Sequence, residues 1–388
     1  MTQPYVYPCE QIKARLGLTS DPLAPFTRGQ QLLPTHPNVG LTGATGWLGR
    51  HLARRLLSQN QDLYLIVPIR ARSVDQGMDR LRELWCPTPE LSAQARREHW
   101  WDRTQVIPIE DLGAPWEECG LKDCVQSLDA VIHAAADMSL ALSLDQAWSA
   151  NVIATQNAYR WGVERGAKRF DHISTLSVFI AGLTPPGKVR EDDALERAQT
   201  LHGGYSSSKW AAEAWLSTQS HLALAVHRLG LLSFSNTDGW ANGDGLYAVS
   251  SAWKKWGCPD FLSPKVSQTV DWSPVDVVAC AVHETIVQGR LGVFHWASRL
   301  SVPSTVWTRL WSHQFGTTSG CWPASNTLGK HALRALGRWS NPDRAKVLWW
   351  HDLFQSGPYE YDAHYSAQIY PQWSWTHAEL EAALAKIS

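Results

Sequence analysis

Short apolar runs alternate with longer amphipathic stretches along the chain from Asn38 onward. Runs of this length and apolar character predict buried strands. The predicted strands are Asn38–Thr42, Leu63–Val67, Gln105–Ile109, Ala130–Ala134, Phe170–Ser174 and Leu224–Leu229.

The stretches between these runs show the spacing of apolar residues that is typical of helices. They predict helices over Leu48–Gln59, Gln146–Arg165 and Ser207–Gln219, and then a helix over Asp276–Gln288 followed by a strand over Gly292–Trp296. Strands that are separated by long helices are joined by right-handed crossovers and therefore lie parallel. The pattern predicts an α/β fold with a doubly wound parallel sheet, the Rossmann arrangement.

Three regions of the chain differ in composition. Residues 1–37 are rich in proline and show little periodicity, so we expect an N-terminal arm that wraps the fold, or a leader. The α/β pattern covers residues 38–235 and 267–298, which we assign to a cofactor-binding Rossmann domain. Residues 236–266 and 299–388 are richer in Trp, Pro and Gly. They predict a smaller Trp-rich substrate domain over the carboxyl edge of the sheet, where open α/β sheets bind ligands.

Composition narrows the class of protein. The 388 residues are 44% hydrophobic and 18% charged, which is typical of a globular chain with an ample core. Lys and Arg number 35 against 36 acidic residues, so we expect no general nucleic-acid binding and no polybasic membrane anchor. No apolar run approaches the roughly 18 residues of a membrane helix, and the first residues do not resemble a signal peptide, which predicts a cytoplasmic protein. The seven cysteines include no CxxC pair, which predicts reduced thiols and no metal site.

A glycine-rich turn follows the first predicted strand. The segment from Thr42 to Gly49 reads TGATGWLG and leads directly into a predicted helix. Glycines with this spacing allow a tight turn, a close approach of backbone N–H groups to a pyrophosphate, and close packing of the helix on the strand. The strand–turn–helix context favours a dinucleotide-binding site, and the alternative is a purely structural turn.

Arginines follow the second predicted strand, where NAD-specific sites usually carry an acidic residue. Asp or Glu there accepts hydrogen bonds from the ribose hydroxyls, whereas a 2′-phosphate requires Arg. The segment Pro68–Ser73 reads PIRARS, and no acid occurs before Asp75. Arg70 therefore predicts NADPH as the cofactor, and Arg80 is the candidate for a second contact with the phosphate.

A tyrosine and a lysine lie four positions apart at the start of a predicted helix. Tyr205 and Lys209 therefore project from one helix face, one turn apart. We expect the ammonium group, together with an oxidised nicotinamide, to favour the phenolate and to make Tyr205 a usable general acid near neutral pH. Thr175 follows the preceding predicted strand, as a further hydroxyl that could polarise a carbonyl oxygen. YxxxK pairs are common, but the three elements in this order predict a reducing centre.

Several segments together resemble the extended short-chain dehydrogenase/reductases. They read TGATGWLG, VIHAAA, NVIAT, HISTLSV, YSSSK and HRLG. More narrowly, the chain resembles the thioester reductase family, which comprises the terminal reductase domains of nonribosomal peptide synthetases, of carboxylic acid reductases and of aminoadipate reductase. The narrower resemblance lies in Ser174–Val178, Thr237–Asp244, Gly257–Asp260, Val270–Asp276 and Glu110–Leu112. It extends from about Asn38 to Ser298.

The resemblance implies roles for individual residues. Thr175, Tyr205 and Lys209 would form the reducing centre. Asp111–Leu112 would lie next to the adenine, and Ala134–Ala135 next to the ribose and the nicotinamide linkage. The cofactor-binding residues that the resemblance and the motifs predict are Gly43, Thr45, Gly46, Trp47, Leu48, Gly49, Arg70, Arg80, Asp111, Leu112, Ala134, Ala135 and Lys209.

Two segments depart from the family's usual pattern. Arg228-Leu229-Gly230 stands where the family usually has Arg-Pro-Gly, and Asp137–Leu140 replaces a run of small polar residues. We therefore expect the loop next to the nicotinamide and the mouth of the substrate site to differ from those of other members.

The resemblance also implies a reaction. An acyl or peptidyl thioester, on the phosphopantetheine of a carrier protein or on coenzyme A, would take a hydride from NADPH while Thr175 and Tyr205 stabilise the oxyanion. Loss of the thiol would give an aldehyde, and a second hydride would give the alcohol. Neither an adenylating domain nor a phosphopantetheine-bearing serine motif is visible, which predicts a stand-alone reductase with a separate carrier partner in natural-product biosynthesis.

The residues leave three alternatives open. Nucleotide-sugar epimerases and dehydratases use the same Thr, Tyr and Lys with tightly held NAD, but the arginines after the second strand argue against this class. Relatives that catalyse a condensation-type release have lost the tyrosine, whereas Tyr205 is present. The third alternative is a regulator that senses the cofactor. Such a protein needs no catalytic residues, so the complete trio of Thr175, Tyr205 and Lys209 argues against it. Consumption of NADPH distinguishes a reductase from an epimerase and from a regulator.

Overall fold

The computed structural model describes residues 6–19, 23–124, 126–139, 142–179, 187–233, 235, 269–270, 272–297, 302–303 and 361–370. The motif segments Thr237–Asp244 and Gly257–Asp260 lie outside the described residues, as does Asp271. The same holds for most of the predicted Trp-rich domain.

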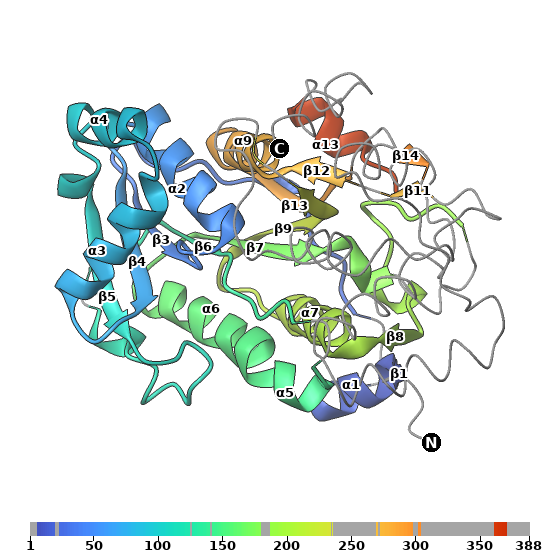
Figure 1. The fold of residues 1–388 in the computed structure, drawn as a ribbon. Coiled ribbons are helices and arrows are strands. Elements are labelled where there is room, and N and C mark those ends of the chain that lie inside the picture. The colour runs from blue at the N-terminus through green and yellow to red at the C-terminus, as the bar shows by residue number, and fades with distance from the viewer. Residues whose placement is uncertain are drawn as a thin grey trace, which may run out of the picture.

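A mostly parallel sheet of eight strands forms the centre of the fold, in the order β2-β13-β9-β7-β6-β3-β4-β5 (Figure 1). Neighbouring strands pair in parallel from β13 to β5, and only β2 runs antiparallel, at the edge next to β13. The predicted Rossmann arrangement is confirmed. The strands are β2 (Gly29–Gln30), β3 (Asn38–Thr42), β4 (Tyr64–Arg70), β5 (Thr104–Ile109), β6 (Ala130–His133), β7 (Arg169–Thr175), β9 (Ala223–Leu229) and β13 (Arg290–Trp296).

Helices cover both faces of this sheet: α2 and α9 lie over one face, and α6 and α7 over the other (Figure 1). Each face therefore buries apolar side chains of the strands against apolar helix faces. The helices that follow or join these strands are α2 (Trp47–Gln59), α3 (Val74–Trp85), α4 (Pro89–Arg97), α5 (Leu144–Trp148), α6 (Ala154–Glu164), α7 (Gly203–Leu216) and α9 (Val275–Val287). Short elements complete the described chain: β1 (Val6–Pro8), α1 (Cys9–Arg15), β8 (Thr200–His202), β10 (Leu231–Ser233), β11 (Thr269–Val270), β12 (Trp272–Pro274), β14 (Val302–Pro303) and α13 (His364–Ile369).

Two helices differ from their predicted bounds by more than one residue. The predicted helix over Gln146–Arg165 is interrupted by a π-helical turn at Ser149–Ile153, which joins α5 to α6. The helix predicted from Ser207 begins at Gly203 instead. Its first turn consists of glycine, tyrosine and serine and shows no apolar periodicity, so the hydrophobic pattern could not detect it.

The N-terminal segment contributes elements that its sequence pattern does not reveal. β1 pairs antiparallel with β8, which directly precedes α7, and β2 pairs with the edge strand β13. Cys9 and Ile12 of α1 are buried in the same apolar cluster as residues of α5 and α7. The backbone N–H of Leu144 donates to the hydroxyl of Tyr7 at 3.0 Å. A helix of seven residues is too short to show a clear period, which explains why the sequence pattern misses it.

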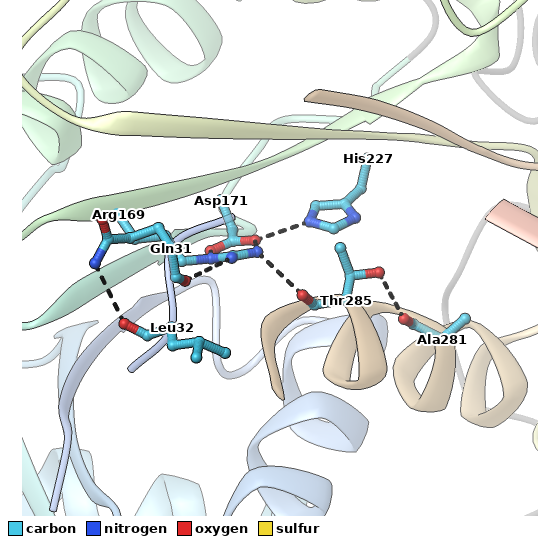
Figure 2. Close-up of polar contacts among 7 residues, drawn as sticks. All are labelled: Gln31, Leu32, Arg169, Asp171, His227, Ala281 and Thr285. Carbon is cyan, nitrogen blue, oxygen red and sulfur yellow. Dashed lines mark hydrogen bonds and ion pairs between the residues drawn. The ribbon is translucent and has the colours of Figure 1, made fainter. Parts of the chain in front are cut away.

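A fully buried ion pair lies on β7, on the face that is covered by α9 (Figure 2). The guanidinium of Arg169 donates two hydrogen bonds to Asp171, of 2.6 and 2.7 Å, and further bonds to the backbone oxygens of Gln31 and Thr285. His227 on β9 contacts the same carboxylate at 3.0 Å. Burial alone would raise the pKa of Asp171, but Arg169 and His227 together hold it below its usual value. The pair therefore joins β7 to β9, to α9 and to the N-terminal arm.

We expect Asp171→Asn to lower the free energy of unfolding by about 3 kcal/mol, because it leaves the buried guanidinium of Arg169 without a counter-charge. Urea denaturation followed by circular dichroism measures this loss. Glu164→Gln is the control, since it breaks the exposed Arg160–Glu164 pair and should change stability by less than about 0.5 kcal/mol. Equal effects of the two substitutions would contradict the assignment.

Candidate active site

The carboxyl ends of β3, β6 and β7 lie next to one another at one edge of the sheet. The chain leaves β3 toward β4 and β5 and then returns to β6 on the other side of β3. This reversal of strand order is the switch point at which open α/β sheets bind ligands. All three strands are followed by residues that the sequence predicts for the site.

The predicted glycine turn joins β3 to α2 and is in close contact with the end of β6. Gly43 adopts a φ of +73°, and a Cβ atom there would lie 2.5 Å from the backbone of Ala134 and Ala135. A Cβ atom on Gly49 would lie 2.1 Å from the carbonyl oxygen of Gly43. Side chains at these two positions are therefore excluded. The structure brings the glycine turn and Ala134–Ala135, both predicted to contact the cofactor, to the same place.

The first turn of α2 presents backbone rather than side chains to this edge. Gly46 is the N-cap residue, and no side chain caps the helix. The side chains of Trp47 and Leu48 are buried in the core, 7% and 6% exposed. Their predicted part in cofactor binding therefore falls to their backbone N–H groups at the positive end of the helix dipole. Thr45 lies in the turn itself.

The predicted phosphate-binding arginines lie together at the carboxyl end of β4. Arg70 and Arg80 are both exposed, and the guanidinium of Arg80 donates to the backbone oxygen of Arg70 at 3.2 Å. Asp111, which follows β5, lies 3.8 Å from the Arg70 guanidinium. The side chain of Leu112 is buried, and its carbonyl oxygen accepts a hydrogen bond from Asn157. The two guanidinium groups could therefore bind the 2′-phosphate of a dinucleotide whose pyrophosphate lies at the glycine turn.

The structure also brings Thr175, Tyr205 and Lys209 together. Thr175 is the last residue of β7, and the other two lie one turn apart on α7. The Thr175 hydroxyl forms a hydrogen bond with the Tyr205 phenol, accepts a bond from the backbone N–H of Ser177, and lies 3.1 Å from the hydroxyl of Ser177. A bond to a neighbouring N–H group fixes the orientation of the Thr175 hydroxyl at the strand end.

The phenol of Tyr205 is held in its protonated form. Burial raises the pKa of Tyr205 to about 12, and the hydrogen bond from Thr175 opposes only part of that rise. This direction is opposite to the one expected for a phenol next to an ammonium group. The reason is burial, which outweighs the other effects on the pKa of this phenol. The ammonium group of Lys209 donates to the backbone oxygen of Ile173 at 2.6 Å and contacts Nε2 of His172 at 3.2 Å. A protonated phenol is the form that a proton donor requires.

Lys209 itself is almost completely buried. Burial lowers the pKa of Lys209 to about 7, and the negative charge of Glu213 acts in the opposite direction. Lys209 therefore takes up or releases a proton near neutral pH, whereas an exposed lysine stays charged.

Two buried histidines below Lys209 were not predicted as site residues. His172 stacks on His133 with ring centroids 5.6 Å apart, and His133 contacts the hydroxyls of Thr42 and Thr155 at 2.8 and 3.1 Å. Burial lowers the pKa of both histidines well below the usual value, so both are neutral. His133 and His172 belong to the segments VIHAAA and HISTLSV. The apolar pattern of these segments does not indicate that the two histidines lie next to Lys209.

The part of the chain that the structure describes shows neither a metal cluster nor a membrane span. No group of three or more His, Cys, Asp or Glu side chains in it is arranged to hold a metal ion. None of the helices described is both long and apolar enough to span a bilayer.

The fold and this site define an extended short-chain dehydrogenase/reductase, an oxidoreductase class that binds a nicotinamide cofactor. The chain belongs to the NAD-binding family that is described as "Male sterility protein", and the model of that family matches residues 41–282. Its relatives include aminoadipate reductases and the terminal reductase domains of nonribosomal peptide synthetases, as the narrower sequence resemblance predicts.

Three similarities show the range of these relatives. The L-2-aminoadipate reductase large subunit of Penicillium chrysogenum is 28% identical over 288 residues, which are 66% of this chain and 19% of that protein. The terminal R domain from the myxalamid PKS-NRPS biosynthetic pathway shares the fold with a TM-score of 0.75 at 20% identity, over 97% of this chain and 96% of that one. UDP-glucose 4-epimerase of Thermotoga maritima reaches a TM-score of 0.59 at 14% identity, over 90% and 97% of the two chains. The chain spans about a fifth or less of the length of the curated relatives it matches.

The buried Lys209 predicts a specific dependence of stability on pH. Its pKa is about 7 in the folded protein and 10.5 in the unfolded chain, so between these values only the unfolded chain holds the proton. Stability rises with pH wherever the unfolded state binds more protons, by about 1.4 kcal/mol per pH unit for one group. The free energy of unfolding of the wild type, minus that of Lys209→Met, should therefore increase from pH 7 to pH 9.

Urea denaturation of both proteins at the two pH values measures this difference. Lys168→Met is the control, because Lys168 is exposed and its replacement should leave the pH dependence unchanged. A difference between wild type and Lys209→Met that stays constant or falls with pH would show that Lys209 is charged in the folded protein.

Proposed function

We propose that this chain is an NADPH-dependent thioester reductase that converts an acyl or peptidyl thioester on a carrier's phosphopantetheine, or on coenzyme A, to an aldehyde. The observation that carries the proposal is the contact between the Tyr205 phenol of α7 and the Thr175 hydroxyl at the carboxyl end of β7, on the same edge of the sheet as the glycine turn that follows β3. The family supports it, because relatives of this chain are named as an aminoadipate reductase and as a terminal reductase domain.

The residues at the edge of the sheet fit a dinucleotide. The glycine turn leaves room where a Cβ atom would collide with the backbone, and the N-terminus of α2 has no capping side chain. Both features favour a bound pyrophosphate. NADPH, when bound, supplies a hydride to the carbonyl carbon of the substrate.

The side chains of this chain then supply a proton and stabilise charge. The Thr175 and Tyr205 hydroxyls donate to the carbonyl oxygen as negative charge develops on it. Tyr205 transfers its proton to that oxygen, which gives a hemithioacetal. The carbon–sulfur bond of the hemithioacetal breaks next, the hydroxyl proton passes to the departing sulfur, and the products are an aldehyde and a free thiol. A positive charge on Lys209 stabilises the phenolate of Tyr205 that proton transfer leaves.

The exposed arginines support NADPH as the cofactor. Arg70 ends β4 and Arg80 of α3 donates to its backbone oxygen, at the place where a ribose 2′-phosphate is bound in this fold. Asp111, which follows β5, forms a long ion pair of 3.8 Å with the guanidinium of Arg70. An anionic phosphate would displace this exposed pair at little cost, because such pairs are weak in water.

We expect Tyr205→Phe to lower kcat for thioester reduction by a factor of about 10²–10⁴, which is the usual contribution of a positioned general acid. NADPH affinity should stay within about twofold, because the phenol hydroxyl faces the substrate. The assay follows the loss of NADPH absorbance with an acyl-coenzyme A and with an acyl-phosphopantetheine as substrates.

Tyr64→Phe is the matched control, since Tyr64 begins β4 at the opposite end of the sheet and should tolerate the change. Full activity of Tyr205→Phe would remove the proposed proton donor. A wild-type protein that consumes no NADPH with either thioester would refute the proposed function and favour an epimerase or a regulator.

We expect Arg70→Ala to weaken NADPH binding by a factor of about 10 to 100 while NADH binding changes by less than about threefold, because a charge-assisted bond to the 2′-phosphate is lost. Calorimetry with both cofactors measures the two effects. Arg82→Ala is the control, because Arg82 is an exposed cation on the same helix as Arg80 that pairs with Asp79 at 3.0 Å. Equal losses for NADPH and NADH would contradict the phosphate site.

A further inference from the structure

Helix α7 docks on the sheet through two buried polar side chains that lie one turn apart. Tyr205, Lys209 and Glu213 follow one another at intervals of four residues and therefore lie along one face of the helix. Lys209 reaches β7 at Ile173 and His172. Glu213 is completely buried and reaches two other strand residues.

Glu213 binds the strand residue next to Thr175. The hydroxyl of Ser174 donates to Oε1 of Glu213. The guanidinium of Arg228 on β9 donates to the same carboxylate, from Nη2 to Oε2 at 2.7 Å and from Nε to Oε2 at 3.0 Å. The carboxylate is therefore shared between β7 and β9.

The register of the sheet places these partners in one polar row. Ser174 of β7 lies opposite Arg228 of β9, which lies opposite His295 of β13. Nη1 of Arg228 is 3.3 Å from Nε2 of His295, and Nδ1 of His295 is 2.9 Å from the backbone oxygen of Asp362. The row is one residue before Thr175 along β7 and is almost fully buried. Charges buried in this way must be paired, and bidentate pairing fixes their geometry.

We propose that Glu213 is a positioning residue: by binding Ser174 and Arg228 at once, it sets where α7 lies on the sheet and thereby the distance between Tyr205 and Thr175. Glu213 contacts neither Tyr205 nor Thr175 through the hydrogen bonds that the structure describes, so its effect on the distance between them passes through α7 and β7. Its negative charge also acts directly on the pKa of Lys209, and Ser174→Ala tests the positioning without removing that charge. A displacement of a reacting group by about 1 Å costs about 10²-fold in rate. The catalytic consequence rests on the proposed function, whereas the docking of α7 does not.

Glu213 is suited to positioning rather than to acid–base chemistry. It is completely buried, and both of its oxygens are engaged by Arg228 and Ser174. The carboxylate thus has a buried counter-charge and no exposure to solvent. It is as deeply buried as Asp171, which pairs with Arg169 on the opposite face of β7 (Figure 2).

The kinetic test compares four variants at a temperature at which circular dichroism shows each to be folded. We expect Ser174→Ala to lower kcat about tenfold and Glu213→Gln about 10²-fold, with the dissociation constant for NADPH changed by less than about threefold. The double variant should lose less than the product of the two single losses, because both remove one interaction. Asp171→Asn is the matched control: it disrupts an equally buried pair on the same strand and should retain kcat within about threefold.

Amide hydrogen exchange measured by mass spectrometry tests the docking of α7 without reference to activity. We expect Ser174→Ala to accelerate exchange in peptides that cover residues 175–179 and 203–209 more than in other peptides of the sheet. Asp171→Asn lowers global stability and should accelerate exchange in these peptides no more than in the other peptides of the sheet. A purely structural role of Glu213 would give equal losses of activity and protection in Glu213→Gln and Asp171→Asn.

The outcomes separate the two proposals. If wild-type protein reduces no thioester, the proposed function fails and the exchange comparison alone decides the positioning role. If Ser174→Ala matches the wild type in exchange, or Asp171→Asn reproduces the effect of Ser174→Ala, the positioning role is overturned.

Discussion

The buried pairing of Glu213 with Arg228 is the interaction on which the geometry of this site depends most. A carboxylate and a guanidinium without access to water can only remain where they satisfy each other, so the pair allows one position of α7 on the sheet. That helix carries Tyr205 and Lys209, and β7 carries Thr175. The contact between the Thr175 and Tyr205 hydroxyls therefore depends on the buried contacts of Glu213 with Ser174 and Arg228.

A second constraint acts at the other side of the site and is steric. Gly43 and Gly49 allow the β3–α2 turn to approach the end of β6 so closely that a methyl group would collide with backbone atoms. This contact keeps the carboxyl edges of β3 and β6 together at the switch point of the sheet. The glycine turn and the trio thus lie at one edge of the sheet although they are far apart in the sequence. Burial also changes the acid–base behaviour of the trio, because desolvation lowers the pKa of Lys209 to about 7.

The sequence predicts the parallel strands to within a few residues, because a buried strand has an apolar run that little else produces. It also predicts the turn and the trio, since their chemistry needs particular residues at fixed spacing. It does not predict α1, the start of α7 at Gly203, or the roles of His172 and Glu213. Short or glycine-rich helices lack a period, and buried polar rows depend on strand register, which residue patterns do not contain. The separate carrier and the Trp-rich substrate domain stay predictions.

The central claim is that the site transfers hydride to a thioester and releases its thiol. The most direct measurement follows NADPH oxidation and thiol release together, with an acyl-phosphopantetheine as substrate. We expect one thiol to appear for the first equivalent of NADPH oxidised. Thiol release should stop when the thioester is exhausted, and NADPH oxidation should stop then or when the aldehyde is fully reduced. Thiol release without NADPH oxidation, or cofactor that stays bound and is never consumed, would contradict it.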